Sequence, residues 1–560
     1  MLTVPVVTIN SVPNKRLRRC LLRNRETART KVRCSVVLPC LLFTALLLPS
    51  QIAVGQDAAA EDSFAAFVRA AGAELRSGDR VPESLPDWER RKQQLRQQLE
   101  TAWGGLPSEP APLEARILDR LSRDGYDVEK IVFQTFPGVF MTANAYVPHG
   151  DGRRPAVLCV HGHWRGAKQD PHVQARCIGL AKLGLFVLAV DAFGAGERGL
   201  EKALGEYHGE MTAATLLPPG RPLSGLQVYE NQRAVDYLLT RPEVDGDRLG
   251  ITGASGGGNQ TMYAGAWDER FRAVVPVCSV GNYQAYLHAA CCMCEVVPGA
   301  LTFTEEWSVL ALTAPRALMV VSATRDAFQF SVGEAQKSLV QVRPVFELYG
   351  CPQNVRHAVF ESPHDYNREM REAMYGWMTL HLKGQGDGSP VPEPPHQTED
   401  PEVLRCYPGD SRPDDWLTLP QFAAREAREL LQHTRAADKP TETTEQRRQQ
   451  LTVQRRKLQH SVLKDAVVPQ NLTTTSQAVK PSATVGDPAL QQWNVVFTPD
   501  AGLQLTASVR RSRSASAAGV PAEEVLLVVS TDDDASETVT RVINRFIAAG
   551  NCVVNVPLRA

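Results

Sequence analysis

The chain has no excess of charge of either sign, which separates it from proteins that bind polyanions through a basic surface. Its 560 residues include 61 Lys and Arg against 62 Asp and Glu, a formal net charge of −1. Nucleic-acid-binding domains carry a basic patch or stripe, so the composition predicts no nucleic-acid partner. With 43% hydrophobic residues, the chain has the composition of a globular protein with a sizeable core. Its length predicts several domains.

Long apolar runs and a paired cysteine framework are also lacking. The apolar stretch 36–48 near the N-terminus is about 13 residues long, whereas a helix that crosses a bilayer needs about 20. Three of the twelve cysteines precede residue 41, and the other nine show no spacing typical of a small disulfide-bonded domain. We therefore expect no stable membrane span in the mature protein and no obligatory disulfides.

The N-terminal 55 residues have the order expected of a secretory signal peptide. A basic stretch, 15–35, in which Glu26 is the only acid, precedes the apolar run 36–48, and small residues follow at Ala53-Val54-Gly55. We expect cleavage near residue 55 and a secreted or periplasmic mature protein. An uncleaved membrane anchor is the alternative.

From about residue 125, apolar runs alternate with helix-like stretches. Continuous apolar runs such as 156–160 are typical of strands buried on both faces, and their alternation with helices predicts an α/β fold: a mostly parallel sheet with helices on both faces. The expected strands are 128–135, 139–147, 156–160, 185–190, a run leading into Gly253, 273–277, 317–322 and 355–360. The expected helices of this region are 173–182, 228–239, a stretch after residue 255, and 367–382.

The sequence is organised around Gly253-Ala254-Ser255-Gly256-Gly257, which lies between an apolar run and a helix-like stretch. A Gly-x-Ser-x-Gly pentapeptide in this strand–turn–helix context holds a nucleophilic serine on a sharp turn. The flanking glycines leave room for the crowded backbone. We therefore predict that Ser255 is a nucleophile and that the N–H of Gly256 points toward a developing oxyanion.

A serine nucleophile needs a base and a third group that orients the base. Asp326 follows the expected strand 317–322, and His364 follows the expected strand 355–360, so both fall at strand carboxyl ends, where open parallel sheets place their sites. We predict that Asp326 is the acid and His364 the base. Asp365 and Asp191 are the alternative acids, although a structural turn role suits Asp191 better.

The second oxyanion donor is expected from the loop after strand 156–160, where His161-Gly162-His163-Trp164 stands. We assign the N–H to His163, with Trp164 as the near alternative and as a substrate-binding residue. The His-x-His spacing raises the possibility of a metal site, but no third ligand follows at a recognisable spacing. We therefore expect no metal and no cofactor.

With these motifs and Asp191-Ala192-Phe193-Gly194-Ala195-Gly196, residues from about 125 to 384 resemble the α/β-hydrolase superfamily. The resemblance is to its dienelactone hydrolase-like and acetyl xylan esterase-like members. It implies an α/β-hydrolase fold, a triad of Ser255, Asp326 and His364, and an acyl-enzyme intermediate. Two features depart from the family: Gly256 replaces the Gln that many xylan esterases of this type have after the serine, and the segment 291–295 is rich in cysteine.

That segment, Cys291-Cys292-Met293-Cys294-Glu295, lies between the strands 273–277 and 317–322. Close cysteines most often fill a tight apolar space, which is the interpretation we adopt, and a disulfide or a bound metal are the alternatives. Further candidates for lining the pocket are Glu197, Arg198, Trp307 and the insertion 199–225 with His208.

The C-terminal part of the sequence looks like a weak internal repeat. The segment 445–451 echoes 89–95, and 502–507 echoes 138–143. This second copy lacks the nucleophile motif, so we predict a truncated, non-catalytic hydrolase-like repeat. The expected domains are a signal peptide 1–55, an N-terminal helical extension 56–110, a catalytic domain 111–384, a linker and helical segment 385–470, and the repeat 471–560.

The sequence as a whole predicts a secreted serine esterase acting on a small-molecule or oligosaccharide ester, such as an acetylated carbohydrate. Two alternatives remain. A prolyl-oligopeptidase-like peptidase shares the fold and triad, but normally has an aromatic residue after the nucleophile and a propeller domain, and we recognise neither here. A non-catalytic binding or scaffold protein is suggested by the second copy. The oligomeric state is not indicated by the sequence.

Overall fold

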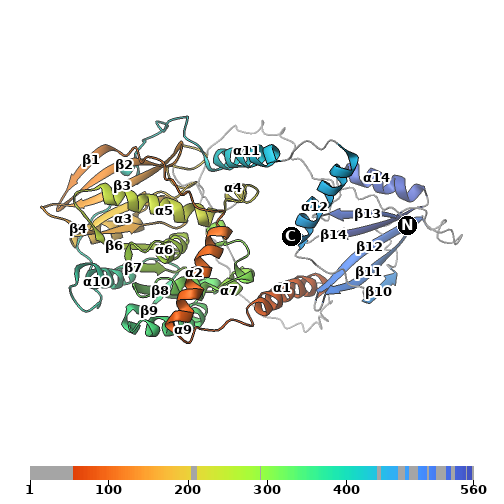
Figure 1. Cartoon of the computed structure of the whole chain (residues 1–560), viewed down its shortest axis with the longest axis horizontal. Coiled ribbons are helices and arrows are strands. Elements are labelled where there is room, and N and C mark those ends of the chain that lie inside the picture. The colour runs from red at the N-terminus through yellow and green to blue at the C-terminus, as the bar shows by residue number, and fades with distance from the viewer. Residues whose placement is uncertain are drawn as a thin grey trace, which may run out of the picture. The chain divides into compact units, whose positions relative to one another are not determined.

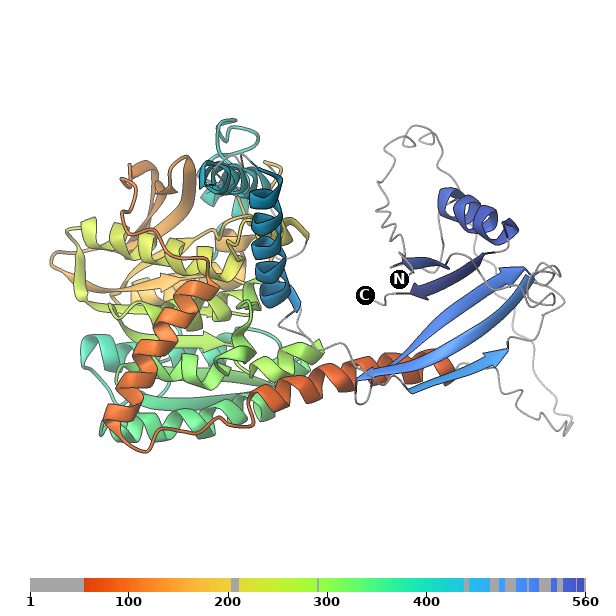
Figure 2. The ribbon, with the colours of Figure 1, turned by 45° about the vertical axis from the view of Figure 1, so that its right-hand side comes forward.

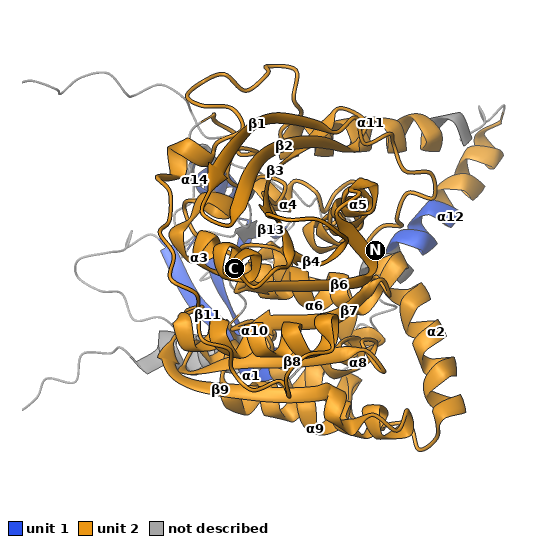
Figure 3. Cartoon of the chain, turned by 90° about the vertical axis from the view of Figure 1, so that its left-hand side faces the viewer, with its two compact units in different colours: residues 1–68, 453–560 blue, residues 69–452 orange. Residues whose placement is uncertain are grey.

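The computed structural model describes two compact units (Figure 3), a large unit of residues 69–452 and a small unit of residues 1–68 and 453–560. The described residues are 55–202, 211–289, 292–437, 443–463, 473–478, 490–500, 503–512, 525–530, 537–549 and 551–557. Residues 1–54 of the expected signal peptide, His208 and Cys291 lie outside them. None of the helices in these ranges has the length and apolar content that a membrane crossing requires. The expected domain boundaries at 110, 384 and 470 stay predictions.

The large unit is built on a nine-stranded sheet with the order β1-β2-β3-β5-β4-β6-β7-β8-β9 (Figure 1). Strands β1 to β3 and the β3–β5 pair are antiparallel, and the pairs from β5–β4 through β8–β9 are parallel. The bounds are β1 Arg116–Arg123, β2 Tyr126–Phe136, β3 Val139–Pro148, β4 Arg154–Cys159, β5 Phe186–Val190, β6 Val244–Ala254, β7 Phe271–Val277, β8 Ala317–Arg325 and β9 Val355–Pro363.

Helices cover both faces of this sheet, which confirms the predicted fold class. One face carries α3 (Pro171–Lys182) and α10 (Arg368–Lys383). The other carries α2 (Leu85–Ala102), α5 (Leu223–Thr240), α6 (Gly256–Trp267), α8 (Glu306–Ala311) and α9 (Val332–Leu348). The short helices α4 (Met211–Ala214) and α7 (Tyr283–Ala289) lie in connections between strands.

The apolar run in β4 shows why a strand that is buried on both faces has a continuous hydrophobic sequence. Successive side chains point to opposite faces of a strand, so Leu158 enters the core under α5 and α6, while Val157 and Cys159 enter the core under α3 and α10. All three side chains are fully buried. A polar side chain in place of Leu158 would lose its hydration in the middle of this apolar core, which is costly.

Two elements of the large unit did not stand out in the sequence. Strand β1 is an exposed edge strand with many charged residues, so it shows little of the apolar alternation that marks a half-buried strand. Helix α9 contains Pro344, a residue that removes a helix hydrogen bond and usually interrupts a helix. Both elements form because of their neighbours: β1 pairs with β2 along its length, and α9 buries Leu339, Val342 and Phe346.

The segment after α10 packs on the large unit instead of leaving it. Glu393 binds Arg371 through two hydrogen bonds of 2.5 and 2.8 Å and accepts a third from Tyr375. Leu404 is fully buried. The helical sequence that follows forms α11 (Leu419–Ala437) and α12 (Thr444–Leu463). At the other end of the chain, α1 spans Gly55–Leu75.

The small unit contains a five-stranded sheet with the order β10-β11-β12-β14-β13, drawn in blue in Figure 2. Its elements are β10 Thr473–Ala478, β11 Leu490–Asp500, β12 Leu503–Ser512, β13 Val525–Ser530, α14 Glu537–Ala548 and β14 Cys552–Pro557. This is the order of β1-β2-β3-β5-β4. The first three strands and the β12–β14 pair are antiparallel, whereas β13 and β14 are parallel, as in the large sheet. The predicted partial repeat is therefore present as a repeated topology.

Candidate active site

Ser255 stands at the sharp turn between β6 and α6. Its backbone is left-handed, with φ 59° and ψ −130°, a strained conformation for a residue with a side chain. Its N–H donates to Val277 O at 3.0 Å, and its carbonyl accepts the N–H groups of Gly258 and Asn259 at 2.7 and 3.0 Å. The residue is 8% exposed. The strand, the helix and the neighbouring strand β7 thus hold the turn from three sides.

Two glycines permit the close packing of this turn. A Cβ on Gly253 would come within 2.6 Å of the carbonyl oxygens of both Gly257 and Val160. A Cβ on Gly257 would come within 2.6 Å of the His161 carbonyl carbon. Backbone atoms cannot move away as a flexible side chain can, so the pattern Gly-x-Ser-x-Gly follows from the approach of the turn to the loop after β4.

Asp326 and His364 meet at the carboxyl ends of β8 and β9. The His364 Nδ1 lies 2.7 Å from Asp326 Oδ1. The Asp326 side chain is fully buried, whereas the imidazole is 37% exposed. The ring of Phe330 stacks on the imidazole at a centroid distance of 6.1 Å. A buried carboxylate on Nδ1 fixes the tautomer of the ring and leaves Nε2 as the nitrogen that can exchange a proton with a substrate or nucleophile.

The structure brings the three predicted triad residues to one edge of the sheet. Ala254, which precedes the nucleophile, pairs with Val277 of β7, and Val277 pairs with Val321 of β8. Arg325 of β8 pairs with Pro363 of β9. Ser255, Asp326 and His364 therefore follow the carboxyl ends of β6, β8 and β9, at one edge of the parallel part of the sheet.

Sequence reasoning missed Cys278, which follows β7 and lies beside this pair. Its sulfur, a carboxylate oxygen of Asp326 and a ring nitrogen of His364 all lie within 4.8 Å of one another. Burial, followed by the negative charge of Asp326, raises the pKa of the Cys278 thiol to about 12. The thiol is therefore protonated at neutral pH and packs against the acid as a small neutral group. Its position at the carboxyl end of the intervening strand was the signal that could have identified it.

The two alternative acids have other partners. Asp191 accepts hydrogen bonds from Thr142 Oγ1 at 2.7 Å and from the N–H of Lys168 at 3.2 Å, and it is fully buried. Burial by itself would raise the pKa of Asp191, but the charge of Lys168 lowers it below its ordinary value. Asp365 accepts the N–H of Tyr366 at 2.7 Å. Asp191 thus has the structural turn role that the sequence favoured.

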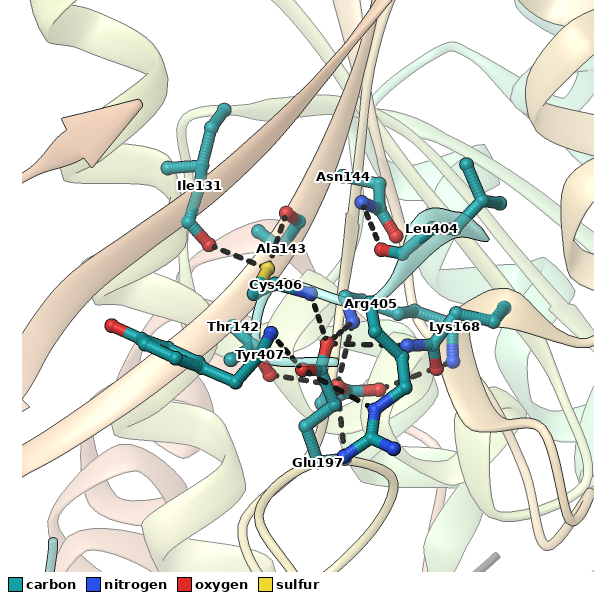
Figure 4. A network of polar contacts seen from close by, with 12 residues as sticks. Ile131, Thr142, Ala143, Asn144, Lys168, Glu197, Leu404, Arg405, Cys406 and Tyr407 are labelled. Carbon is teal, nitrogen blue, oxygen red and sulfur yellow. Dashed lines mark hydrogen bonds and ion pairs between the residues drawn. The ribbon is translucent and has the colours of Figure 1, made fainter. Parts of the chain in front are cut away.

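Glu197 and Arg198, named as pocket candidates, take part in buried networks. Glu197 accepts hydrogen bonds from the N–H groups of Cys406 and Tyr407 at 2.9 and 2.8 Å, and from Lys168 Nζ at 2.5 Å (Figure 4). Arg198 pairs with Glu230 at 2.5 Å. Glu197, in the loop after β5, therefore binds the segment around Cys406 through hydrogen bonds. Trp307, another candidate, is 2% exposed and belongs to the hydrophobic core.

The loop after β4 lies against the nucleophile turn. A Cβ on Gly162 would come within 2.8 Å of Ser255 Cβ. The next residue, His163, has its Cε1 atom 2.9 Å from the position of a Cβ on Gly256. Trp164 is half-buried and stacks on His172 at a centroid distance of 6.3 Å. The loop is thus close enough to Ser255 to supply the predicted second hydrogen-bond donor to the oxyanion, the N–H of His163.

Comparison of the sequence with known proteins agrees with this architecture. Residues 77–279 match a family model described as "Abhydrolase family". The curated protein "Putative hydrolase YtaP" of Bacillus subtilis (strain 168) is 33% identical over 141 residues, which cover 23% of this chain and 44% of that protein. "Uncharacterized protein PA2218" of Pseudomonas aeruginosa is 26% identical over 166 residues, which cover 29% of this chain and 38% of that protein.

Among solved structures, "Methylesterase BT1017" is similar with a TM-score of 0.53 and 23% identity, covering 66% of this chain and 81% of that chain. At this identity the likeness shows a shared fold. The chain spans less than half the length of the two curated relatives. The strand order, the serine turn at the end of β6 and the structural likeness show that the chain has an α/β-hydrolase fold, and residues 77–279 are similar to the family that the matching model describes.

Proposed function

We propose that the chain is a serine hydrolase that cleaves carboxylic esters through Ser255, His364 and Asp326. The observation that carries the proposal is the 2.7 Å contact between His364 Nδ1 and the buried Asp326 carboxylate. It lies on the edge of the sheet where Ser255 occupies its strained turn. A pair of this kind is what converts a serine hydroxyl into a nucleophile.

In the proposed reaction, Ser255 Oγ attacks the ester carbonyl while His364 Nε2 takes the hydroxyl proton. The oxyanion of the tetrahedral intermediate accepts hydrogen bonds from the N–H groups of Gly256 and His163. His364 then gives its proton to the departing alcohol, which leaves an ester on Ser255. Water, deprotonated by His364, attacks this acyl-enzyme, and collapse of the second intermediate releases the acid and restores Ser255.

Asp326 keeps its charge throughout this cycle. It orients the imidazole and stabilises the imidazolium that forms when Nε2 takes the proton. The neutral thiol of Cys278 is compatible with this role, because it adds no second negative charge beside the carboxylate. No metal or cofactor takes part in these steps.

The substrate we propose is an ester of a carbohydrate, such as an acetylated sugar, with Trp164 contributing an aromatic surface beside the site. This choice rests on the resemblance of the motifs to acetyl xylan esterase-like proteins. Secretion rests on the N-terminal sequence, and the sequence supports no stable membrane span once a signal peptide is removed.

The first test is hydrolysis of short p-nitrophenyl esters by the full chain, compared with Ser255→Ala. We expect the variant to lose at least about a hundredfold in kcat, a conservative value for removal of a triad member. A wild-type rate that Ser255→Ala leaves intact would refute the assignment of the nucleophile. If neither protein cleaves these esters, prolyl peptide substrates test the peptidase alternative. Ligand binding that is unchanged in Ser255→Ala would favour a binding protein.

A further inference from the structure

Three potential metal ligands converge beside the nucleophile turn, from two segments far apart in the sequence. His163 Nε2, in the loop after β4, lies 2.9 Å from Cys292 Sγ and 3.7 Å from Cys294 Sγ. The two sulfurs are 2.7 Å apart. Cys292 is 5% exposed and Cys294 is fully buried. One nitrogen and two sulfurs thus face the same small volume.

The backbone also positions the Cys292 sulfur. The N–H of Cys294 donates to Cys292 Sγ at 3.3 Å, so the residue that supplies one sulfur holds the other in place. The thiolate is the form of cysteine that binds metals.

Neither packing nor a disulfide accounts for the whole arrangement. Cysteines that only fill apolar space have no reason to direct both sulfurs at an imidazole nitrogen. The sulfur separation of 2.7 Å exceeds the ~2.05 Å of a disulfide bond. A disulfide would also not explain why His163 Nε2 lies next to both sulfurs. One ion held by all three atoms explains why they meet.

We propose that His163 Nε2, Cys292 Sγ and Cys294 Sγ bind a zinc-class divalent cation. Imidazole nitrogen and thiolate sulfur are the ligands that zinc prefers, whereas magnesium and calcium select oxygen. Binding releases the two thiol protons to solvent. The sulfurs then move apart to suit Zn–S bonds of about 2.3 Å in a tetrahedral arrangement.

The position of this site indicates its role. The Cys294 sulfur lies 3.2 Å, and the His163 ring 2.9 Å, from where a Cβ on Gly256 would stand. The ion would therefore join the loop after β4 to the segment 292–295 directly over the residue that follows Ser255. The inference goes beyond the proposed ester hydrolysis and does not depend on it, because it concerns only what these three side chains bind.

The test uses the full chain, reduced and freed of metal by a chelator, and titrates it with Co²⁺ alone. Cobalt takes zinc sites and reports thiolate ligands through a strong sulfur-to-cobalt charge-transfer absorption. We expect one equivalent of Co²⁺ per chain, this absorption, visible bands of tetrahedral intensity, and loss of all of them when Zn²⁺ is added.

Single substitutions identify the ligands. Cys292→Ser and Cys294→Ser should each weaken Co²⁺ binding at least about tenfold and reduce the charge-transfer band. The matched control is Cys351→Ser, because this buried cysteine lies outside the cluster and donates to Phe346 O and Pro315 O, as a serine hydroxyl can. It should bind Co²⁺ like the wild type. Circular dichroism melting of each variant separates a lost ligand from a lost fold.

Two results would overturn the proposal. If the reduced chain gives no charge-transfer band and its thiols all titrate as free after unfolding, the sulfurs only pack together. If the chain as purified has two fewer titratable thiols until a reductant is added, and still binds no Co²⁺ afterwards, the pair forms a disulfide instead. Both results are independent of any esterase assay, so failure here is distinguishable from failure of the proposed function.

Discussion

His364 and Asp326 face each other across the ends of two adjacent parallel strands, with Nδ1 2.7 Å from Oδ1. The acid is enclosed, while the imidazole keeps 37% of its side-chain surface exposed. Burial of the carboxylate strengthens its electrostatic interaction with the ring. The acid is thus enclosed, while part of the imidazole is exposed to solvent.

Replacement of the acid tests this relationship. Asp326→Asn should lower kcat for p-nitrophenyl acetate by about 10³–10⁴, because a carboxamide does not hold the imidazole in its productive tautomer or stabilise the imidazolium. The melting temperature should change little, since the substitution preserves the shape of the side chain. Steady-state kinetics on both proteins provide the measurement.

Asp365→Asn is the matched control, because Asp365 stands next to His364 in the sequence and hydrogen-bonds the N–H of Tyr366. It should retain kcat within about tenfold of the wild type, since a displaced neighbour costs less than a lost triad member. A large loss in this variant with a small loss in Asp326→Asn would reverse the assignment of the acid.

Glu197→Gln should destabilise the large unit by about 2–3 kcal/mol. Burial alone would lower the pKa of Lys168, but the charges of Asp191 and Glu197 raise it above its ordinary value. The neutral amide removes one of these two charges and weakens the hydrogen bonds from Cys406 and Tyr407. Urea unfolding curves measure the loss.

An exposed ion pair serves as the control for the predicted loss of stability in Glu197→Gln. Glu361 is 71% exposed and pairs with Arg325, which is 61% exposed. Glu361→Gln should cost less than about 1 kcal/mol, because water and salt screen such pairs. Equal losses in the two variants would mean that burial adds nothing to the Glu197 network.

His381 should make stability depend on pH between about 6.5 and 4. Burial, with a smaller effect of Arg356, lowers its pKa from the ordinary 6.5 to about 4. The unfolded chain therefore binds a proton more readily in this range, so the contribution is fully present above pH 6.5 and is lost as pH falls toward 4. His381→Phe, which keeps a ring against Trp377, should reduce the fall in melting temperature between pH 8 and 4.5 by a few degrees.

In the wild-type protein a second histidine, His357, also makes the melting temperature depend on pH. The His381→Phe variant leaves this contribution unchanged. The pKa of His357 is lowered to about 4, by burial and then by Arg343. A partial, not complete, flattening of the melting curve is therefore expected in His381→Phe. Parallel curves for the two proteins would contradict the assigned role of His381.

Much of the fold could be predicted because its signals are local. Apolar runs such as that around Leu158 mark strands that both faces of the sheet bury, and Ser255 with its glycines marks a turn that few other residues could form. The positions of Asp326 and His364 after their strands predicted that both lie at the carboxyl edge of the sheet, where the structure has them. In the small unit, the echo of 138–143 in 502–507 pointed to a repeat whose strand order the structure shares.

What the sequence by itself determined is therefore the strand–helix alternation, the serine turn and the order of the expected triad. Only the tertiary structure decided which distant residues meet. Cys278 lies beside Asp326 because it follows β7, which pairs with β8 in the sheet. His163 meets Cys292 across 129 positions of sequence. Spacing along the chain carries no signal for such pairs, because their proximity arises from the packing of whole strands and loops, after local structure has formed.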